Sequence, residues 1–410
     1  MEQTFLTELK IEKVRHLQDI TIPLSKTERK NLILTGKNGS GKTSVLEELA
    51  AYIQMVSANT YPQARGYIRK ILEIESEIKQ TTDTLELIHL EAEKAGDLDR
   101  LENYAFTTFP RKLRGDWASD EKMSAKFRSG QFIIAYYGDT RKLEVTKYKH
   151  IEKVLLNPFY EMFDRPSKDL TKYLVDLKFT KLISQSQNNS DRAVQIDEWF
   201  ARFENTLRRI YGDPSLKLDF NSDTFQFSIL INGREPFDFN TMSMGYAAVF
   251  DIVADLMMRM ESQRTYDLEG IVLIDEIETH LHVELQKQIV PILTALFPNI
   301  QFILTTHSPF ILNSAPNAVI YDLEKHMLVE DGMENLSYEG IVEGFFEVDR
   351  FSQKLRKYFQ EYKQLVTSEN LSDLDYARIA ELEDYLDEVP DYLALDFAHE
   401  YSRLKAEFDG

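Results

Sequence analysis

The chain has 410 residues, of which 43% are hydrophobic and 28% charged, and its formal net charge is −20 at pH 7. This length and composition are those of a globular protein with two or three domains and a large core. So acidic a chain repels nucleic acid on average, and a DNA or RNA contact therefore requires a local basic patch, a partner or a face made by assembly. Cysteine is absent, which excludes disulfides and thiolate metal sites.

Nothing in the sequence points to a membrane or to export. No apolar run is long enough to cross a bilayer. Residues 1–5 lack the basic segment that opens a secretory signal. Since the lack of cysteine also suits a reducing compartment, we expect a cytoplasmic protein with no membrane contact.

The first predicted elements are three strands that lead into a glycine-rich loop. Residues 4–11 and 17–24 are predicted to form a short antiparallel pair, in which Pro23 suits the end or the edge of a strand. The apolar residues 31–35 predict a buried strand. Apolar residues at helical spacing over 45–53 predict a helix, so the loop connects a strand to a helix.

This loop matches the phosphate-binding P-loop (Walker A) pattern G-x-x-x-x-G-K-[ST] at every fixed position. Its glycines let successive backbone N–H groups point at one phosphate cluster, and the positive end of the following helix adds attraction. We expect Lys42 to reach the β- and γ-phosphates and act in catalysis, and the Thr43 hydroxyl to bind Mg²⁺. The predicted ATP-binding residues are Gly36, Lys37, Asn38, Gly39, Ser40, Gly41, Lys42, Thr43 and Ser44.

Residues 56–130 have the pattern of an inserted helical hairpin. Isoleucine and leucine recur among Glu, Lys and Gln between residues 68 and 90, a helical pattern too short for a sustained coiled coil. Residues 111–128 form the most basic segment of the chain and also hold Trp117 and Phe127. They are a candidate contact for nucleic acid or a partner, and an ordinary charged helix face is the alternative.

The middle of the chain is predicted to return to the sheet and then to continue as helices. Residues 131–138 predict a strand, and residues 150–212 are mostly helical in pattern. Apolar residues alternate over 216–231 around a polar turn, which predicts a β-hairpin. The predicted domains are residues 1–55, 56–130, 131–215, 216–345 and the helical 346–410.

A serine-glycine turn opens the next predicted helix. Ser243 can cap this helix with its hydroxyl, and Gly245 permits a close backbone approach. A simple N-cap is one interpretation of the turn. The other is a helix end that contacts phosphate.

Two later strand ends carry the remaining candidate residues. Residues 271–274 are aliphatic and precede Asp275 and Glu276, which is the Walker B form. With a P-loop in the same chain, Asp275 is expected to hold Mg²⁺ and Glu276 to orient and polarise the attacking water. His307 follows another buried strand over 300–306, where ligands bind in open α/β sheets, and is expected to contact the γ-phosphate in catalysis.

The order of these parts resembles the ABC-type ATPase fold, over residues 4–55 and 216–315. Residues 277–282 and 306–309 are more closely similar to the RecF/SMC-like ATPases, which include the OLD-type and Septu-type anti-phage defence ATPases. The resemblance implies an α/β fold with an ABC-ATPase head domain. Such a head has a P-loop NTPase sheet and an antiparallel β subdomain, here with a helical insertion and a helical C-terminal extension.

The resemblance also implies a function, namely ATP binding and hydrolysis with Mg²⁺. Because two heads of the ABC family sandwich two ATP molecules, it implies a homodimer or higher homo-oligomer in which Ser243 and Gly245 act in trans. The Septu-type systems imply a separate nuclease subunit, of HNH type, that is regulated by the nucleotide state. Contact with nucleic acid would then occur through this partner or through the local basic patch.

Several departures from these families leave alternatives open. Met244 and Tyr246 differ from the Leu-Ser-Gly-Gly-Gln signature of transporters, which argues against a transporter subunit. Asp373 and Asp375 could imitate a nuclease metal pair, but they lie among helical polar residues, which favours a nuclease in trans. One alternative function is a nucleotide-gated scaffold with little turnover. Another is a RecF/SMC-like DNA-repair ATPase that binds DNA with Arg111, Arg114 and Lys126.

Overall fold

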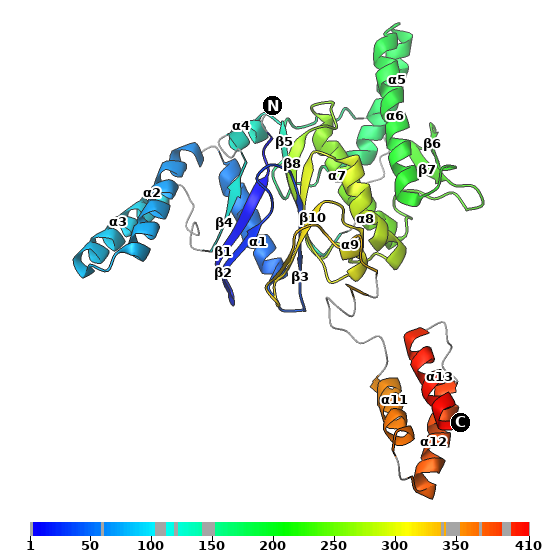
Figure 1. Cartoon of the computed structure of the whole chain (residues 1–410). Coiled ribbons are helices and arrows are strands. Elements are labelled where there is room, and N and C mark those ends of the chain that lie inside the picture. The colour runs from blue at the N-terminus through cyan, green and yellow to red at the C-terminus, as the bar shows by residue number, and fades with distance from the viewer. Residues whose placement is uncertain are drawn as a thin grey trace. The chain divides into compact units, whose positions relative to one another are not determined.

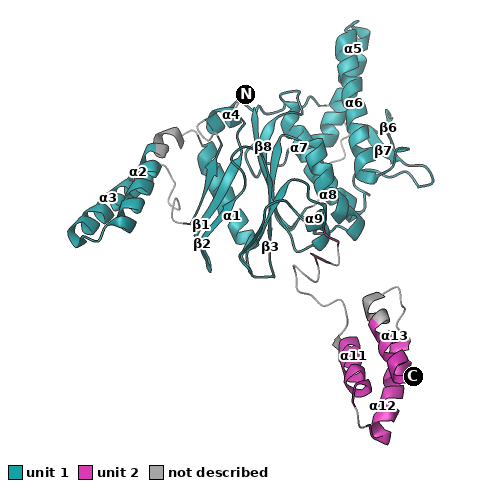
Figure 2. Cartoon of the chain, viewed as in Figure 1, with its two compact units in different colours: residues 1–335 teal, residues 336–410 magenta. Residues whose placement is uncertain are grey.

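The computed structural model describes residues 3–58, 61–102, 112–118, 122–141, 152–337, 340–341, 353–368, 371–387 and 395–409. The chain divides into two units, Met1–Asn335 and Leu336–Gly410 (Figure 2). The predicted P-loop, acidic strand end and strand-end histidine all belong to the first unit.

A six-stranded sheet forms the centre of the first unit, in the order β11-β10-β3-β9-β8-β5 (Figure 1). Five of its strands run parallel, and β11 pairs antiparallel with β10. Most of their side chains are buried, which explains the nearly continuous apolar runs in the sequence. The predicted α/β fold class is confirmed. The strands are β3 (Asn31–Thr35), β5 (Phe132–Tyr137), β8 (Glu269–Ile274), β9 (Ile300–Thr305), β10 (Ala318–Asp322) and β11 (Met327–Val329).

A second, antiparallel sheet has the order β2-β1-β4. Strands β1 (Leu6–Val14) and β2 (Leu17–Pro23) form the pair expected from the sequence. Helix α1 (Lys42–Ser57) contacts β1 and β4 of this sheet and β9 of the central sheet. The side chains between α1 and the two sheets, among them Leu9, Val45 and Ile303, therefore join them in one core.

Strand β4 (Leu113–Trp117) lies where the sequence predicted a helical insertion. It pairs with β1, and Gly115 allows this pairing because a Cβ atom there would lie 2.3 Å from Cδ1 of Leu6. The Tyr52 hydroxyl donates to the Gly115 carbonyl oxygen at 2.7 Å. The charged residues of this segment made it look helical in the sequence, although one face of β4 is apolar and buried.

The basic residues near this strand are held by acids of the same chain. Lys112 pairs with Glu48 at 2.5 Å, Arg114 with Glu12 at 3.1 Å, Lys126 with Glu269 at 2.8 Å and Arg128 with Glu161 at 3.1 Å. Arg111 lies outside the described residues. These pairs come from strands and helices on several sides, so the described cations do not form one free patch for a nucleic-acid backbone.

Helices α2 (Tyr61–Gln80) and α3 (Thr84–Glu102) pack together as a hairpin (Figure 1). Lys70 forms ion pairs with Glu93 at 2.7 Å and Asp97 at 3.1 Å, and Lys94 pairs with Glu75 at 2.6 Å. Ile68 and Ile71 of α2 join the core around α1. The segment is thus tied to the rest of the unit at its base.

The other face of the central sheet carries a second helical layer (Figure 1). Helix α7 contacts β5 and α8, and α8 packs against α9. The sequence predicted the hairpin over 216–231, and β6 and β7 confirm it by pairing antiparallel. The elements of this part are η2 (Pro166–Asp169), α5 (Leu170–Ser186), α6 (Ser190–Tyr211), β6 (Lys217–Asn221), β7 (Gln226–Leu230), α7 (Met244–Glu261), α8 (Val283–Leu296) and α9 (Pro309–Ser314). Helix α4 (Met123–Arg128) lies beside α1 instead.

The second unit contains α11 (Gln353–Val366), α12 (Asp373–Asp387) and α13 (Leu395–Asp409) around a small core that includes Tyr362 and Leu382. Asp375, one of the two acids weighed as a metal pair, accepts hydrogen bonds from the Ser372 backbone N–H at 2.8 Å and the Ser372 hydroxyl at 2.7 Å. Asp373 and Asp375 occupy the first turn of α12, where acids favour helix formation. Across the described part of the chain, no helix has the length and apolarity needed to span a bilayer.

Candidate active site

The candidate residues follow the carboxyl ends of three neighbouring strands. The P-loop joins β3 to α1, Asp275 and Glu276 follow β8, and His307 follows β9. Strand β9 lies between β3 and β8, and all three are parallel. The sheet therefore brings residues more than 200 positions apart in the sequence to one edge, which is where ligands bind in such folds.

The P-loop has the backbone conformation that its glycines permit. Gly36, Gly39 and Gly41 have φ values of 132°, 85° and 96°, in a region that other residues rarely occupy. A Cβ atom at Gly36 would lie 2.8 Å from the Ser40 hydroxyl oxygen. The loop thus wraps tightly around the position in front of α1.

Lys42 lies inside this loop and is 5% exposed. Its ammonium group donates to the carbonyl oxygens of Gly36 at 2.9 Å and Lys37 at 3.1 Å. Burial lowers the pKa of Lys42, and the carboxylates of Glu276, Glu278 and Asp275 act against this shift. The amine is therefore held at the loop next to several acids.

Asp275 connects the P-loop to the neighbouring strands. Its Oδ1 atom accepts hydrogen bonds from the Thr43 hydroxyl at 3.3 Å and from the Thr305 hydroxyl at 2.5 Å. Asp275 is 4% exposed and Thr305 is fully buried. The two residues predicted to bind the metal, Thr43 and Asp275, thus present oxygen atoms to each other.

Glu276 begins a tight turn after β8 and has a φ value of 44°. Its backbone N–H donates to the Thr305 hydroxyl at 2.7 Å, and its carboxylate accepts from the Thr279 hydroxyl at 3.3 Å. Thr305, which contacts both acids, was not predicted from the sequence. A threonine in an apolar strand gives little sign of its neighbours in other strands.

Arg141 is a second residue that the sequence did not reveal. Its guanidinium donates to the carbonyl oxygens of Asp275 at 3.4 Å, Glu276 at 2.6 Å and Thr279 at 3.4 Å. Arg141 is 6% exposed, and burial lowers its pKa. The N–H groups of this planar guanidinium therefore fix the backbone of the turn that carries Glu276.

His307 is fixed by Glu278 and faces the P-loop. The His307 backbone N–H donates to Oε1 of Glu278 at 2.5 Å, and the Thr306 hydroxyl donates to Oε2 of Glu278 at 2.7 Å. The Gly36 backbone lies beside the His307 ring and acts to raise its pKa. Burial and the nearby Lys42 charge lower the pKa of His307, which favours a neutral imidazole at physiological pH.

The remaining P-loop residues surround this point. Lys37 is exposed and pairs with Glu324 at 2.8 Å, while Asn38 and Gly39 are exposed. Ser44 is buried behind the loop.

The Ser40 hydroxyl is buried without a hydrogen-bond partner in the described part of the chain. An unpartnered buried hydroxyl in a glycine loop suits a polar ligand such as phosphate, and the carboxylate and hydroxyl oxygens of Asp275 and Thr43 suit Mg²⁺.

The serine-glycine turn lies at the start of α7 and is not joined to this site. Ser243 occupies the N-cap position, but its hydroxyl makes no capping hydrogen bond. Ser243 is exposed, and Met244 beside it is 68% exposed. Gly245 is needed for close packing, since a Cβ atom there would lie 3.1 Å from the His280 carbonyl oxygen. No hydrogen bond within the described residues links Ser243 to the P-loop.

Relatives of the chain occur among named ATPases and defence proteins. The Septu protein PtuA of Bacillus mycoides (strain KBAB4) is 25% identical, over 94% of this chain and 51% of that protein. The "Retron Vc95 probable ATPase" of Vibrio cholerae serotype O1 biovar El Tor is 26% identical, over 73% of this chain and 70% of that protein. The chain thus spans about half the length of the first of these relatives.

Among solved structures, the SMC head domain from Thermotoga maritima is similar over 77% of this chain and 94% of its own, with 12% identity and a TM-score of 0.35. The fold assignment follows from the strand order of the central sheet. The resemblance to Septu-type ATPases, expected from the motifs, is confirmed by the relatives, and a family model also matches the chain. That model matches residues 32–313, from the P-loop strand past the histidine, and the chain belongs to the family described as "AAA domain, putative AbiEii toxin, Type IV TA system".

Proposed function

We propose that this protein binds ATP with Mg²⁺ at the edge formed by β3, β9 and β8 and hydrolyses it. The observation that carries the proposal is the meeting of Lys42, Asp275 and His307 around one loop. A hydrogen bond links Thr43 to Asp275, and the Gly36 backbone lies beside the His307 ring. The same loop carries the orphaned Ser40 hydroxyl.

In this proposal, Lys42 gives up its two carbonyl acceptors and donates to the β- and γ-phosphates. The exchange is favourable because hydrogen bonds between two charged groups are stronger than those to neutral carbonyls. Thr43 and Asp275 hold Mg²⁺, which would neutralise charge on the phosphates. Thr305 keeps the Asp275 carboxylate directed at Thr43, since its hydroxyl donates to the same Oδ1 atom.

Glu276 is the proposed catalytic acidic residue of the reaction. Arg141 and Thr305 fix its backbone from two sides, so the carboxylate starts from a defined position after β8. From there it orients and polarises the attacking water. His307, held neutral beside Lys42, can donate to a γ-phosphate oxygen or accept from the water.

The second nucleotide contact is proposed to come from another copy of the chain. The exposed Ser243 hydroxyl has no capping partner at the start of α7, and the adjacent Met244 side chain is also exposed. A helix N-terminus with a free hydroxyl is suited to bind phosphate. An ATP-bridged homodimer, in which Ser243 and Gly245 face the partner's P-loop, would bury the exposed Ser243 and Met244 side chains.

The nucleotide state is proposed to regulate a separate effector, a nuclease of HNH type, in anti-phage defence. Support comes from the relatives, which are named for the Septu and retron systems. The ion pairs that hold Arg114 and Lys126 weigh against the alternative of a DNA-repair ATPase that binds DNA through these residues. A nucleotide-gated scaffold is the other alternative, and hydrolysis distinguishes it.

The test compares the unmodified chain with Glu276→Gln and with the matched control Glu284→Gln, which changes an exposed acid on α8. We expect Glu276→Gln to lower ATP turnover by about 100-fold or more while ATP still binds and the dimer persists longer. Glu284→Gln should have no effect. Phosphate release and size-exclusion chromatography with ATP measure the two properties. Equal turnover in both variants would remove Glu276 from the mechanism, and ATP-dependent assembly with no turnover at all would favour the scaffold.

A further inference from the structure

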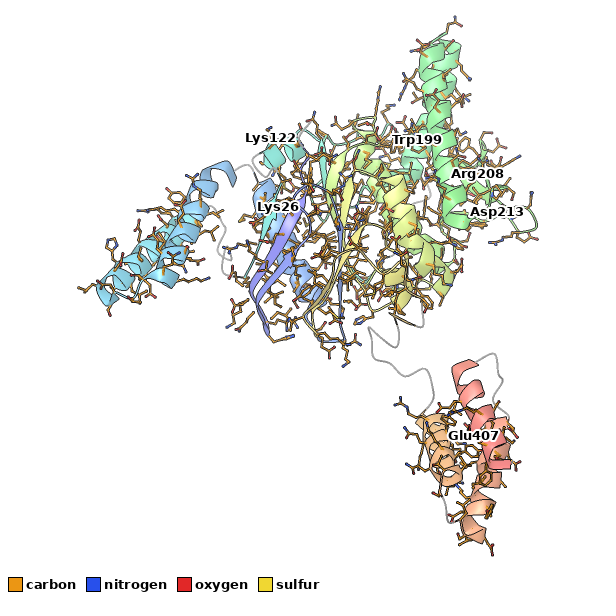
Figure 3. All side chains as sticks on the ribbon, viewed as in Figure 1. Lys26, Lys122, Trp199, Arg208, Asp213 and Glu407 are labelled. Carbon is orange, nitrogen blue, oxygen red and sulfur yellow. The ribbon has the colours of Figure 1, made fainter. Side chains whose placement is uncertain are left out.

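A pocket of about 290 Å³ lies apart from the candidate active site. It opens to solvent and is bounded by α5, α6, the last residue of α7 and the connection to β8. Figure 3 shows one of its lining residues, Trp199, on α6. The pocket adjoins the amino end of β8, whereas Asp275 follows the carboxyl end. Six residues of strand separate the two, a distance of roughly 20 Å.

Three arginines line this pocket, Arg192, Arg202 and Arg264. The Arg202 guanidinium lies over the Tyr266 ring, 4.4 Å from its centre, and Arg192 donates to the Gln195 side chain at 3.2 Å. Within the described part of the chain, none of the three forms an ion pair. Such a group is unusual in a chain with 68 acidic and 48 basic residues. Four cations near β4, by contrast, are paired with acids, namely Lys112, Arg114, Lys126 and Arg128.

Two acids also line the pocket, and their positions leave the arginines available. Glu261 is buried and accepts hydrogen bonds from Tyr173 at 2.6 Å, Trp199 at 2.7 Å and Tyr266 at 2.6 Å. Burial and the adjacent Glu261 carboxylate raise the pKa of Tyr173 and of Tyr266, so both stay as donors. The Glu261 carboxylate is therefore already bound by three side chains of the pocket lining, while Glu198 is exposed.

The chemistry of the lining selects a class of ligand. Arginine forks bind phosphate and carboxylate oxygens with paired hydrogen bonds, and three of them around one cavity provide more positive charge than the two acids remove. The volume is at the lower end of pockets that hold small organic molecules and is too small for a folded partner. The apolar Leu177 and Ile196 and the edge of Trp199 provide surface for a non-ionic portion.

We propose that this pocket binds a phosphate monoester of a small organic molecule, with the phosphate on the arginines and the organic part against Trp199. The site is separate from the proposed ATP site and does not depend on it. Helix α7 ends at Glu261 in the pocket and begins at the Ser243 turn, which is proposed to contact the ATP of a partner copy.

The test is calorimetric titration of the full chain with ribose 5-phosphate, inorganic phosphate and ribose. We expect ribose 5-phosphate to bind at least about tenfold more tightly than ribose and more tightly than inorganic phosphate. The fluorescence of Trp199 should change with the same midpoint. Since the chain has two tryptophans, Trp117→Phe leaves Trp199 as the single reporter. Lys42→Ala should leave this binding unchanged, which separates it from phosphate at the P-loop.

The arginines provide the matched variants. Arg192→Gln and Arg202→Gln should each weaken ribose 5-phosphate binding by about tenfold, while Arg209→Gln, an exposed arginine on the same helix outside the pocket, should not. All three positions are at least partly exposed, so circular dichroism should show intact folding. No binding up to about 10 mM, or equal binding in Arg192→Gln and Arg209→Gln, would overturn the proposal. Tighter binding of inorganic phosphate than of the ester would overturn it too.

Discussion

The two ends of β8 arrange charge in different ways. At the carboxyl end, Asp275 and Glu276 are fixed by Thr43, Thr305 and Arg141 within hydrogen-bond distance. At the amino end, the acid Glu261 is satisfied by three aromatic donors, while nearby arginines have no acidic partner in the described residues. At the carboxyl end of β8, the charged side chains are therefore already fixed by their neighbours around the P-loop. At the amino end, the arginines leave an excess of positive charge, which favours binding of an anionic ligand.

The largest expected effect is at the carboxyl end, with Lys42→Ala. The ammonium makes two hydrogen bonds to the loop, and charge-assisted contacts to phosphates would replace them. Losing these should weaken ATP binding by about 100-fold or more, because each is worth about 1.5–3 kcal/mol. Titration with a fluorescent ATP analogue measures it. Lys287→Ala on α8 is the control, and an unchanged affinity for ATP would mean that the P-loop is not the nucleotide site.

Thr305→Val asks whether the buried threonine organises the two acids. The variant keeps the shape of the side chain but removes the hydrogen bonds to Asp275 and the Glu276 backbone. We expect turnover to fall about 10- to 100-fold, as for residues that orient metal ligands. The cause would be the changed position of the Asp275 carboxylate more than a weaker affinity for Mg²⁺. Steady-state phosphate release at varied Mg²⁺ measures this. Thr294→Val on α8, whose hydroxyl bonds only within its own helix, should behave as the unmodified chain.

Arg141→Lys tests the support beneath the Glu276 turn. Lysine keeps the charge but not the fork that reaches three carbonyl oxygens, so the turn should loosen. We expect roughly tenfold slower turnover with unchanged ATP affinity, and a free energy of unfolding lower by about 1–3 kcal/mol. Kinetics well below the melting temperature separate the two effects. Equal turnover there would leave Arg141 with a role in stability alone.

Asp251→Asn examines α7, the helix that runs between the two ends. Burial, with the nearby Asp255, raises the pKa of Asp251 from 3.8 to about 6. The folded state therefore binds this proton more tightly than the unfolded chain, and stability from this group is lost as pH rises from about 4 to about 6. Asparagine should raise the free energy of unfolding by about 3 kcal/mol at pH 7.5 but only about 1 kcal/mol at pH 4.5. Urea titrations at the two pH values check the difference. A pH-independent gain would show that Asp251 titrates normally.

The smallest effect is expected for Lys126→Ala, near the amino end of β8. Its pair with Glu269 is only partly buried, so the free energy of unfolding should fall by about 1 kcal/mol or less. Because Glu269 already pairs with this lysine, Lys126→Ala should bind DNA at low salt as the unmodified chain does. A fluorescence anisotropy titration with duplex DNA decides this. A clear loss of DNA binding would restore the basic segment as a nucleic-acid contact.

The parts of the site with local signals could be predicted from the sequence. The P-loop is a continuous pattern, and Asp275 and His307 each end an apolar strand, so their meeting followed from parallel strand order. Arg141 and Thr305 could not be found in this way. Their partners lie in the turn after β8, at separations of 134 residues from Arg141 to Asp275 and 30 residues from Thr305 to Asp275, and neither neighbourhood carries a motif. Strand β4 was missed for a related reason, because its charged residues masked a short apolar face that only pairing with β1 makes meaningful.

The central position of β3 also has a consequence for how the protein is made. This strand, whose last residue is Thr35, pairs with β9 and β10, which end at Thr305 and Asp322. At about 5–20 residues per second, a ribosome needs on the order of half a minute to supply them after the P-loop has emerged. Until then β3, which precedes the P-loop, lacks the two strands with which it pairs. A growing chain therefore exposes its earliest functional segment well before it can use it, and a prematurely terminated product should have no ATPase activity.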